Sequence, residues 1–506
     1  MLSIIVSILC VAVIFFFRRR ERLPREIPLC PPSHLGRDVR LRHWNETVPN
    51  DGLLRFRDTG VELLLVTKPS ILHEILVGRA VEFVKPQVVR DRLYPTTGNG
   101  LLFAEGDEHK MQRKALNPAF SYRHVKDLYP IFWRKAFQLV KCLEKESETG
   151  EIVTIRPWAR RTTLDIIGVA GMDHDFGALH EPDNYLVKQY ETMHVDPSRG
   201  EAIFGYLLSF ISSPLARFVM QNIPTKRGKA LRAGSKAIRE VCARLIQEKR
   251  EQTAREASKD ATATPTTSSK DLLSVAVNSA SLPPATLVDQ MMTFLTAGHG
   301  TTSHALQWSV YSLCKHLDIQ SRLREEVAYL VEREMEGEEE EEEEEEGPTV
   351  TAAEIDSLPY LNAFVNEVLR FYPPIPSTVR EPLQTTTLEG YKIPRGTKLV
   401  IPISIANKDT SQWGEDAGVF NPDRWLKPGC AHTGGALSSS SSLTFLTGPR
   451  SCIGAGFARA ELACLVACLV GRFQMQLEDP NKELTLNLKG VGVAPEDGVR
   501  VRLTMV

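Results

Sequence analysis

One cysteine stands in surroundings that could keep a thiolate ionised. Cys452 lies in the stretch Phe445-Leu-Thr-Gly-Pro-Arg-Ser-Cys-Ile-Gly454, directly before a long apolar stretch typical of a helix. The start of a helix offers free backbone N–H groups and a partial positive charge, and both stabilise an anion. Arg450 adds a permanent cation that suits a carboxylate. A buried structural cysteine at a helix start would leave a similar pattern.

Three further residues shape this loop. Gly448 and Gly454 permit tight turns and a close approach to the backbone, and Phe445 offers a flat apolar face. Together with Cys452 and Arg450 they indicate a loop that presents a thiolate to a planar, anionic, metal-bearing ligand. The nine cysteines are widely spaced, and their pattern predicts neither a disulfide framework nor a zinc site.

This stretch resembles the haem-binding loop of the cytochrome P450 family, Phe-x-x-Gly-x-Arg-x-Cys-x-Gly, at every fixed position. The resemblance implies haem b (iron protoporphyrin IX) as cofactor, with Cys452 as its axial ligand and Arg450 on a haem propionate. The glycines at 454 and 456 partly match a dinucleotide loop. However, one long helical stretch follows them where that motif needs a βαβ unit, so we reject a dinucleotide site.

A second group of residues matches a structural feature of the same family. Glu367 and Arg370 are three residues apart in a predicted helix, so their side chains share one face. Such a pair is usually an exposed ion pair on the protein surface. The resemblance instead implies a buried structural lock, in which both residues join Arg424 of the stretch Asn421-Pro-Asp-Arg-Trp425. Removing one partner from a buried network of this kind is costly.

Further propionate partners follow from the resemblance. Arg380 follows the Pro-rich stretch 373–376 in the way of a family arginine that reaches a propionate. His109 and Arg113 are four residues apart on one predicted helical face, and they resemble the upstream residues that pair with propionates. A plain surface histidine is the alternative interpretation of His109.

The predicted oxygen-handling helix departs from the family pattern. Its stretch Ala297-Gly-His-Gly-Thr-Thr302 carries Gly300 where the family has an acid before its threonine. The resemblance implies that Thr301 donates a hydrogen bond to dioxygen and that Gly298 lets the helix widen. The usual proton-relaying acid is missing, and His299 is a possible substitute. The other interpretation of His299 is a packed or solvent-facing residue.

A mainly helical body with small β-sheets must position these residues, and the resemblance implies the cytochrome P450 fold. Long stretches with apolar residues three and four apart predict helices at 125–144, 231–255, 286–316 and 456–469. Short β-like stretches occur at 61–66, 385–393, 398–403 and 499–505.

The N-terminus predicts a membrane anchor. Residues 1–17 are almost wholly apolar and are followed at once by arginines, which favours a transmembrane signal anchor over a cleaved signal peptide. The positive-inside rule places the body, predicted as one haem-thiolate domain over 37–506, in the cytosol. Residues 18–36 form a basic, proline-rich linker. We therefore expect a single-pass protein of the endoplasmic reticulum membrane.

Two insertions are predicted to be disordered, at about 256–270 and 336–347. The first is rich in Ser, Thr and Ala, and the second contains a run of nine glutamates that repel one another. Residues 200–223 are unusually apolar for a connection, which fits either core packing or a segment that lines substrate or dips into the membrane. Apolar residues at 85–103 and 195–220 suggest a lipophilic small-molecule substrate.

Composition limits the function classes. The 506 residues are 42% hydrophobic and 25% charged, which excludes collagen-like and wholly disordered proteins. The formal charge of −2 becomes +7 without the glutamate run, which is too small and scattered to indicate nucleic-acid binding.

The resemblance implies a monooxygenase that inserts one oxygen atom from O2 into a lipophilic small molecule. It also implies electrons from NADPH through a separate cytochrome P450 reductase, with cytochrome b5 as a second possible partner. Stretches such as Asn407-Lys-Asp409 are similar to fungal microsomal members and suggest secondary metabolism. Two alternatives stay open: a reductase-independent haem-thiolate isomerase or dehydratase, which Gly300 favours and Thr301 disfavours, and a non-catalytic haem-binding protein.

Overall fold

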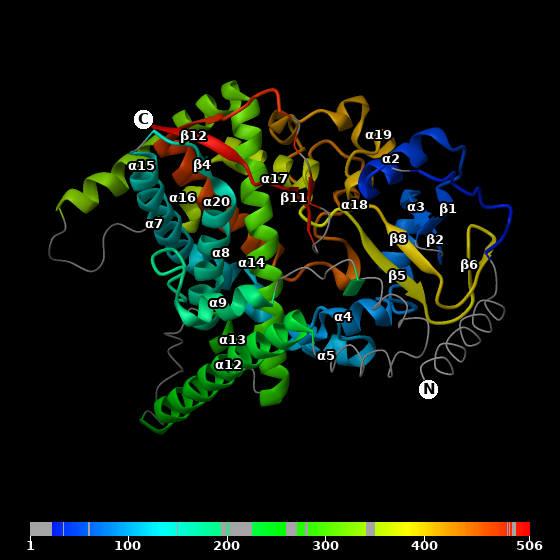
Figure 1. The fold of residues 1–506 in the computed structure, drawn as a ribbon, viewed down its shortest axis with the longest axis horizontal. Coiled ribbons are helices and arrows are strands. Elements are labelled where there is room, and N and C mark those ends of the chain that lie inside the picture. Colours follow the sequence, from blue (N-terminus) through cyan, green and yellow to red (C-terminus); the bar gives the residue numbers. More distant parts are fainter. Residues whose placement is uncertain are drawn as a thin grey trace.

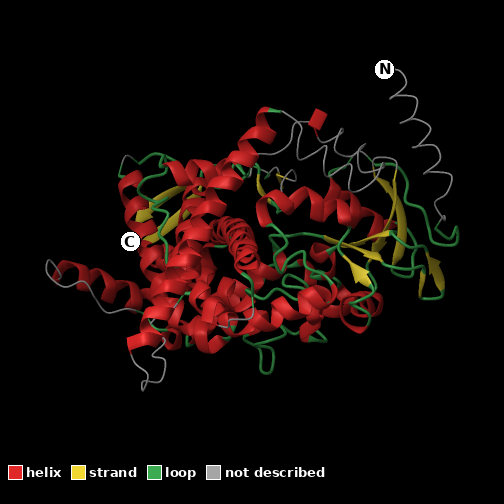
Figure 2. Cartoon of the chain, turned by 90° about the horizontal axis from the view of Figure 1, so that it is seen from below, coloured by secondary structure: helices red, strands yellow, loops and turns green. Residues whose placement is uncertain are grey.

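The molecule divides into a helical side and a smaller side that holds the main β-sheet. The computed structural model describes residues 23–33, 35–58, 61–148, 150–193, 200–201, 225–259, 271–278, 282–340, 350–482, 484, 486–487 and 492–506. Figure 1 shows the helices gathered on the left and the sheet on the right, and the view from below in Figure 2 shows the same division. The prediction of a mainly helical fold with small sheets is confirmed.

Helix α14 (Pro284–Lys315) is the central element of the helical side (Figure 1). It packs against α8 (Ile155–Met172), α12 (Lys226–Lys259) and α20 (Ala455–Arg472). Helix α20 is apolar around almost its whole circumference, and a helix of that kind must be buried. Helix α7 (Tyr129–Ser147) covers α20 with its apolar face. The four helices predicted from periodicity therefore exist, each with slightly different ends.

The remaining helices are shorter or more peripheral. Their bounds are α2 (Arg37–Thr47), α3 (Pro69–His73), α4 (Gln87–Thr97), α5 (Gly106–Leu116), α6 (Tyr122–Val125), α9 (Tyr185–Thr192), α13 (Leu272–Asn278), α15 (Leu317–Glu340), α16 (Ala352–Asp356), α17 (Pro359–Phe371), α18 (Ile403–Ala406) and α19 (Thr410–Trp413). Proline stands in the first turn of α14 and α17, where its missing N–H costs no helical hydrogen bond.

The main sheet has five strands in the order β1-β2-β8-β5-β3. The strands are β1 (Leu53–Asp58), β2 (Val61–Val66), β3 (Phe83–Val84), β5 (Thr378–Pro382) and β8 (Lys398–Ile401). The pairing of β2 with β8 is parallel, whereas the other three pairings are antiparallel. The sheet brings β5, which carries Arg380, beside residues from the N-terminal part of the chain.

The smaller sheets complete the β structure. A three-stranded antiparallel sheet joins β4 (Val153–Thr154), β12 (Arg500–Met505) and β9 (Phe473–Leu477), and β10 (Leu486–Asn487) pairs with β11 (Ala494–Pro495). The predicted strand at 385–393 is a hairpin of β6 (Thr386–Leu388) and β7 (Tyr391–Ile393). Both turn residues of this hairpin, Glu389 and Gly390, have positive φ, which is typical of tight two-residue turns.

Part of the proline-rich segment packs against the sheet. The Cys30 N–H donates to the Arg55 carbonyl at 2.7 Å, the Arg55 N–H donates to the Pro28 carbonyl at 2.8 Å, and Ile27 is fully buried. The predicted anchor at 1–17 lies outside the described residues. Among the described helices, none has the length and apolar character needed to span a membrane.

Both predicted insertions begin with helical residues. Helix α12 continues to Lys259 and α15 continues to Glu340. The predicted disorder is therefore wrong for residues 256–259 and 336–340, which are helical. These residues are rich in Glu, Lys and Ala, which favour helix. The remainder of each insertion, and residues 202–224, lie outside the described part.

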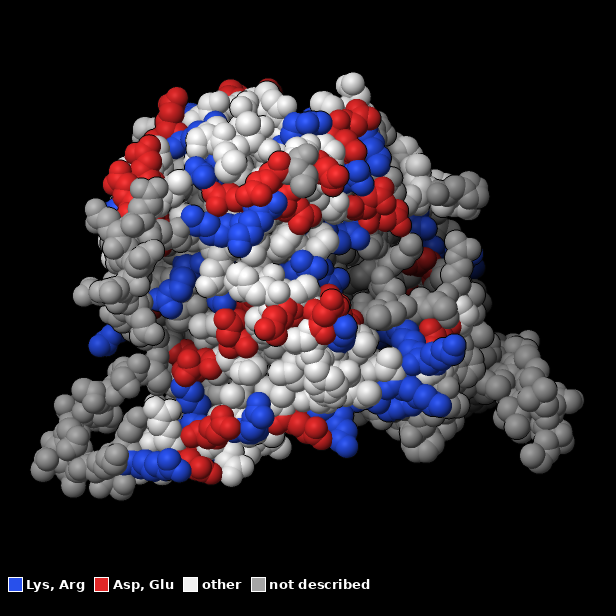
Figure 3. Space-filling view, turned by 60° about the vertical axis from the view of Figure 1, so that its left-hand side comes forward, with Lys and Arg blue, Asp and Glu red and all other residues white. Residues whose placement is uncertain are grey.

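Charges of both signs are interspersed on the molecular face drawn in Figure 3. Lys and Arg alternate with Asp and Glu over this face instead of forming one large field. This face therefore presents no single-sign field to a highly charged partner.

Candidate functional site

The loop before α20 holds Cys452 with its side chain accessible to solvent. The Cys452 N–H donates to the Phe445 carbonyl at 2.7 Å, which closes the loop on itself. Gly448 has φ +75°, and a Cβ there would overlap the Leu76 carbonyl oxygen, so glycine is needed at this position. Gly454 lies in the turn before α20, as predicted, but its φ of −87° is one that other residues also adopt.

The surroundings of Cys452 act on its thiol in opposite directions. Burial raises its pKa, whereas the Gly454 N–H and the positive charges of Arg113 and Arg459 lower it. The side chain is accessible to solvent, although protein surrounds it closely enough to raise the pKa of its thiol. An ionised thiolate at this position would gain from both arginines.

Arg459 has no role in the sequence prediction, yet it belongs to the loop. Its guanidinium lies 4.5 Å from the centroid of the Phe445 ring, and its Nε donates to Asn366 Oδ1 at 3.1 Å. The Phe445 ring therefore holds the Arg459 cation near Cys452, in addition to providing an apolar face. Arg459 lies in the second turn of α20, close after the loop that carries Cys452, and this position in the sequence could have indicated the arrangement.

The predicted propionate partners lie in one basic group. Arg113 Nη1 donates to the Ser451 carbonyl at 2.6 Å, next to Cys452. Arg450 donates to the Ala104 carbonyl at 2.6 Å and forms an ion pair with Glu105. The structure thus brings residues from α5 and from the cysteine loop together, as the sequence predicted.

His109 and Arg380 belong to the same group and are buried. Burial, followed by the charges of Arg450 and two other cations, lowers the pKa of His109 to about 4, so the imidazole is neutral at pH 7. Arg380 is 2% exposed, and burial lowers its pKa to about 10. Its Nη1 donates to Thr378 Oγ1 at 3.0 Å, but its buried Nη2 has no partner among the described residues. A buried guanidinium N–H without a partner is costly, and an anion would satisfy it.

Lys85 is a member of this group that the sequence prediction missed. Its Nζ donates to the Leu102 carbonyl at 2.7 Å. Burial, reinforced by Arg380 and Arg450 and opposed by Glu105, lowers its pKa to about 7. Basic side chains therefore outnumber the one acid, Glu105, in this group. The excess of buried donors fits a ligand with carboxylates, such as haem with its two propionates.

The central helix α14 places Thr301 on its half-buried side. Thr301 Oγ1 donates to the Ala297 carbonyl at 2.8 Å, which satisfies its hydroxyl within the helix. Every residue from Pro284 to Lys315 is α-helical, so the widening expected at Gly298 is not present. A Cβ at Gly298 would lie 3.1 Å from Ile167 Cδ1, which shows that close packing with α8 also needs a small residue there.

His299 and Gly300 differ in how they are held. His299 is 4% exposed; its Nδ1 lies 3.1 Å from the Tyr190 hydroxyl, and its carbonyl accepts from Thr163 Oγ1 at 3.1 Å. Packing against α8 and α9 therefore accounts for His299, as the alternative interpretation proposed. In the part of the chain that the structure describes, a Cβ at Gly300 would meet nothing within 4 Å, which leaves space at the position of the expected acid.

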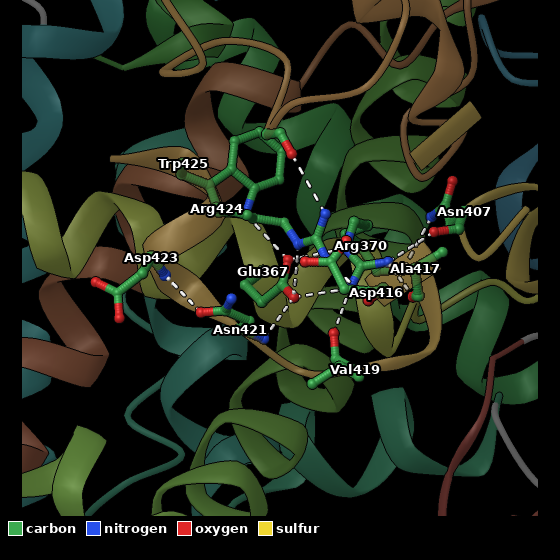
Figure 4. A network of polar contacts seen from close by, with 11 residues as sticks. Glu367, Arg370, Asn407, Asp416, Ala417, Val419, Asn421, Asp423, Arg424 and Trp425 are labelled. Atoms are coloured by element: carbon green, nitrogen blue, oxygen red, sulfur yellow. Dashed lines mark hydrogen bonds and ion pairs between the residues drawn. The ribbon is translucent and has the colours of Figure 1, made fainter. Parts of the chain in front are cut away.

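Glu367 and Arg370 form the centre of a fully buried network (Figure 4). Arg370 donates to both carboxylate oxygens of Glu367, at 2.7 and 2.8 Å, and both side chains are 0% exposed. The Arg370 guanidinium also donates to the carbonyls of Asn407, Ala417 and Val419 at 2.7–2.9 Å. Every carboxylate and guanidinium group of this pair therefore has partners, which is the condition for a stable buried ion pair.

Arg424 joins the same network, as predicted. Its Nε lies 3.3 Å from Glu367 Oε1, an ion-pair contact without hydrogen-bond geometry, and its Nη2 donates to the Asp416 carbonyl at 2.9 Å. Trp425 Nε1 donates to Glu367 at 3.0 Å, and the Asn421 N–H donates at 2.8 Å. The sequence prediction missed these two donors, although it included the stretch that carries them.

Asn407 connects this network to the cysteine loop. Its Oδ1 accepts from the Leu443 N–H at 2.7 Å, and its Nδ2 donates to the Arg370 carbonyl and to Thr444 Oγ1 at 3.1 and 2.8 Å. Leu443 and Thr444 directly precede Phe445. The lock and the loop around Cys452 are thus one hydrogen-bonded unit.

Comparison with known proteins identifies the family. The family Cytochrome P450 matches residues 50–500. This chain belongs to the cytochrome P450 family. Its members are haem proteins with a cysteine thiolate ligand, and the predicted P450 fold is thereby confirmed.

Similar P450 proteins come from fungi. Cytochrome P450 monooxygenase sphH of Aspergillus fumigatus is 46% identical over 472 residues, which cover 92% of this chain and 83% of that protein. Cytochrome P450 monooxygenase FSL4 of Gibberella zeae is 38% identical and covers 91% and 83%. The protein is therefore an enzyme of the P450 monooxygenase class.

A solved structure shares the fold. The crystal structure of a cytochrome P450DA mutant heme domain matches 95% of this chain and 98% of that domain, with a TM-score of 0.74 and 21% identity.

Proposed function

We propose that this P450 uses haem b, held by the Cys452 thiolate, to insert one oxygen atom from O2 into a lipophilic small molecule. The observation that carries this proposal is the accessible Cys452 thiol between the Gly454 N–H, Arg113 and Arg459, beside a basic group with an unsatisfied Arg380. When bound there, a haem with a thiolate ligand supplies chemistry that favours O–O cleavage.

The basic group would hold the carboxylates of the haem. Arg380 has a buried donor without a partner among the described residues, and Arg113 and Arg450 provide charge. Lys85, whose pKa burial lowers to about 7, provides a further donor. His109 is neutral at pH 7, so it would contribute a hydrogen bond rather than a charge. Thr301 is the residue that can donate a hydrogen bond on the substrate side, once its hydroxyl turns away from the Ala297 carbonyl.

The ligation is tested by spectroscopy. The reduced carbonyl complex of the natural protein should show the red-shifted Soret band of thiolate ligation, and Cys452→Ser should lose it. Cys464→Ser, a change of the same type at a buried position in α20, should keep it. An unaltered band in Cys452→Ser would refute the assignment.

The partners and location follow from the resemblance to microsomal members. Electrons would come from NADPH through a separate cytochrome P450 reductase, with cytochrome b5 as a second donor. Residues 1–17 would anchor the chain in the endoplasmic reticulum membrane with the catalytic domain in the cytosol. The sequon at Asn45 should then stay unglycosylated in microsomes; a mass shift after glycosidase treatment would contradict this orientation.

The fungal origin of the similar proteins supports a role in secondary metabolism. Metabolite profiling of a strain that lacks this protein would identify the compound class. The expected result is the accumulation of a lipophilic precursor and the loss of its oxygenated product, and an unchanged profile would contradict the role.

One observation keeps a second function in view. Gly300 leaves the acid position empty, and His299 is packed against Tyr190, so a proton relay at either residue is not evident. A haem-thiolate isomerase or dehydratase that rearranges a peroxide would need no such relay. NADPH consumption that depends on substrate and reductase supports the monooxygenase, whereas turnover of a hydroperoxide without reductase supports the isomerase. A non-catalytic haem protein would show neither.

A further inference from the structure

The C-terminal end of α4 and the turn that follows it, residues 95–101, are held mainly by side chains of other helices. The last carbonyls of a helix have no partner within it. Here the Thr97 carbonyl accepts from Thr293 Oγ1 at 3.0 Å, and the Thr96 carbonyl accepts from Thr296 Oγ1 at 3.1 Å. Both threonines belong to α14, so this helix supplies the partners that the end of α4 lacks.

Two N–H groups of the turn bind the same helix. The Asn99 N–H donates to Asp289 Oδ2 and the Leu101 N–H donates to Gln290 Oε1, both at 2.9 Å. Asp289 and Gln290 lie one turn of α14 before Thr293. Four side chains of α14 thus hydrogen-bond to backbone groups of residues 96–101. We call them the docking strip: Asp289, Gln290, Thr293 and Thr296.

The turn comes close enough to the docking strip to require glycine. Gly98 has φ +63°, and a Cβ there would overlap the Asp289 carboxylate. A Cβ at Gly100 would overlap Thr293 Oγ1. Both glycines let the backbone approach the strip, which indicates that the contact is built for this geometry.

Asp289 also joins a third element. Its Oδ1 accepts from Arg239 Nη1 of α12 at 2.7 Å, while its Oδ2 holds the turn. Both side chains are largely buried, with 19% and 29% exposure, so this pair is less screened than a surface ion pair. One carboxylate therefore ties together α12, α14 and residues 95–101, at the junction of α4, α12 and α14 (Figure 1).

The docking strip lies next to the α14 face that contacts the cysteine loop region. Phe294 follows Thr293 and packs edge-on against Phe120, with 5.2 Å between ring centroids, and Phe120 borders Gly454. Thr293, Ala297 and Thr301 are four residues apart in this regular helix, so their side chains share one face of α14. Residues 95–101 therefore border the side of α14 that carries Thr301.

We propose that Asp289, Thr293 and Thr296 are positioning residues that fix residues 95–101 as one wall of the substrate space, and that the bond from Arg239 ties the placement of this wall to α12. This inference rests on the proposed haem site for the direction that the wall faces. The positioning itself does not depend on the oxygenation reaction. The docking strip would thus limit which lipophilic molecules reach the haem.

Hydrogen exchange of the haem-loaded protein tests the positioning. In Asp289→Ala, the amides of Asn99 and Leu101 should exchange about tenfold faster or more, because the turn opens as one unit. Amides in α7 should keep their natural rate. Glu240→Ala is the matched control, since it removes an exposed α12 ion pair with Lys236. Unchanged exchange at 95–101, a change at Asn99 alone, or an equal change in the control would each overturn the proposal.

A milder variant covers the case in which Asp289→Ala does not fold. Thr293→Val keeps the side-chain shape and removes one bond, to the Thr97 carbonyl. It should accelerate exchange at Asn99 and Leu101 by a smaller factor, with an unchanged carbonyl Soret band. Natural exchange rates in a folded Thr293→Val protein would contradict the proposal.

Access to the haem tests the specificity role. Imidazole and the bulkier clotrimazole both bind haem iron and shift the Soret band, so stopped-flow spectroscopy gives their association rates. Asp289→Ala should speed clotrimazole binding several-fold relative to imidazole, since only the bulky ligand depends on the wall. An unchanged ratio, with faster exchange, would refute the substrate-wall role. A failure of the proposed haem site would instead appear as no Soret shift in the natural protein.

Discussion

The buried lock and the central part of α14 are held in opposite ways. Around Glu367, two arginines, an indole N–H and a backbone N–H converge on one carboxylate with 0% exposure. A Cβ at Gly300 would meet no atom of the described residues within 4 Å. Several contacts thus hold the region that supports the cysteine loop. The position that the family uses for proton delivery can instead change at little structural cost.

The largest effect is expected in the lock. Glu367→Ala removes the buried carboxylate that pairs with both Arg370 and Arg424. Arg424 keeps the Asp416 carboxylate at 2.9 Å, but Arg370 loses its carboxylate partner, and leaving a buried charge unpaired costs about 3–5 kcal/mol. Thermal unfolding should show this loss, and little haem-loaded protein should be recovered. Asp423→Ala is the control, because it breaks an equally short but half-exposed pair with Arg322, worth at most about 1 kcal/mol. Equal losses in both variants would mean that burial is not what distinguishes the lock.

The lock also shows what the sequence could predict. The resemblance to the family, carried by Glu367, Arg370 and the stretch around Arg424, located all three charged members, whereas their spacing alone would equally fit a surface pair. Asn407, Asn421 and Trp425 were missed as members because their roles depend on contacts between distant segments. Lys85 was missed for the same reason, because it becomes buried beside Arg380 only when β3 pairs with β5.

The oxygen side shows the limit of pattern matching. The sequence identified the departure at Gly300, but not that α14 would stay regular at Gly298 or that His299 would pack against Tyr190. Both outcomes depend on α8 and α9, whose side chains fill the space beside α14. The helices themselves were predictable because their apolar periodicity is local.

Asn407→Ala should have an intermediate effect. The change leaves the Leu443 N–H and the Arg370 carbonyl without their partner, at a cost of about 1–3 kcal/mol. Because Leu443 begins the stretch that leads to Cys452, the thiolate Soret band should also weaken. Asn362→Ala, which removes bonds to the carbonyls of Ile355 in α16 and Leu358 just before α17, should lower stability without this spectral change. A loss of the band in both variants would contradict a specific connection through Asn407 between the lock and the cysteine loop.

A smaller effect separates the two glycines of α14. Replacing an internal helical glycine by alanine stabilises the helix by about 1 kcal/mol, and Gly300→Ala should realise this gain because its Cβ meets open space. Gly298→Ala should gain less or lose stability, since its Cβ would lie 3.1 Å from Ile167. Denaturant unfolding of both variants measures the difference. A larger gain at Gly298 would contradict the contrast in packing.

The smallest structural change concerns proton delivery. Gly300→Glu restores the family acid one residue before Thr301, in space that the helix leaves open. If the missing acid limits proton supply, reducing equivalents escape as hydrogen peroxide. The variant should then raise product per NADPH at least about twofold, since a positioned acid or base contributes about 10²–10⁴-fold to proton transfer.

His299→Ala distinguishes the missing-acid account from a relay through His299. The side chain is packed and contacts the Tyr190 hydroxyl, so its loss should lower stability while the ratio of product to NADPH stays as in the natural protein. A relay through His299 would instead make His299→Ala release more peroxide and leave Gly300→Glu without benefit. Product, NADPH and peroxide measured together in both variants decide between the two. Only the missing-acid account predicts that an added carboxylate at position 300 raises the product formed per NADPH.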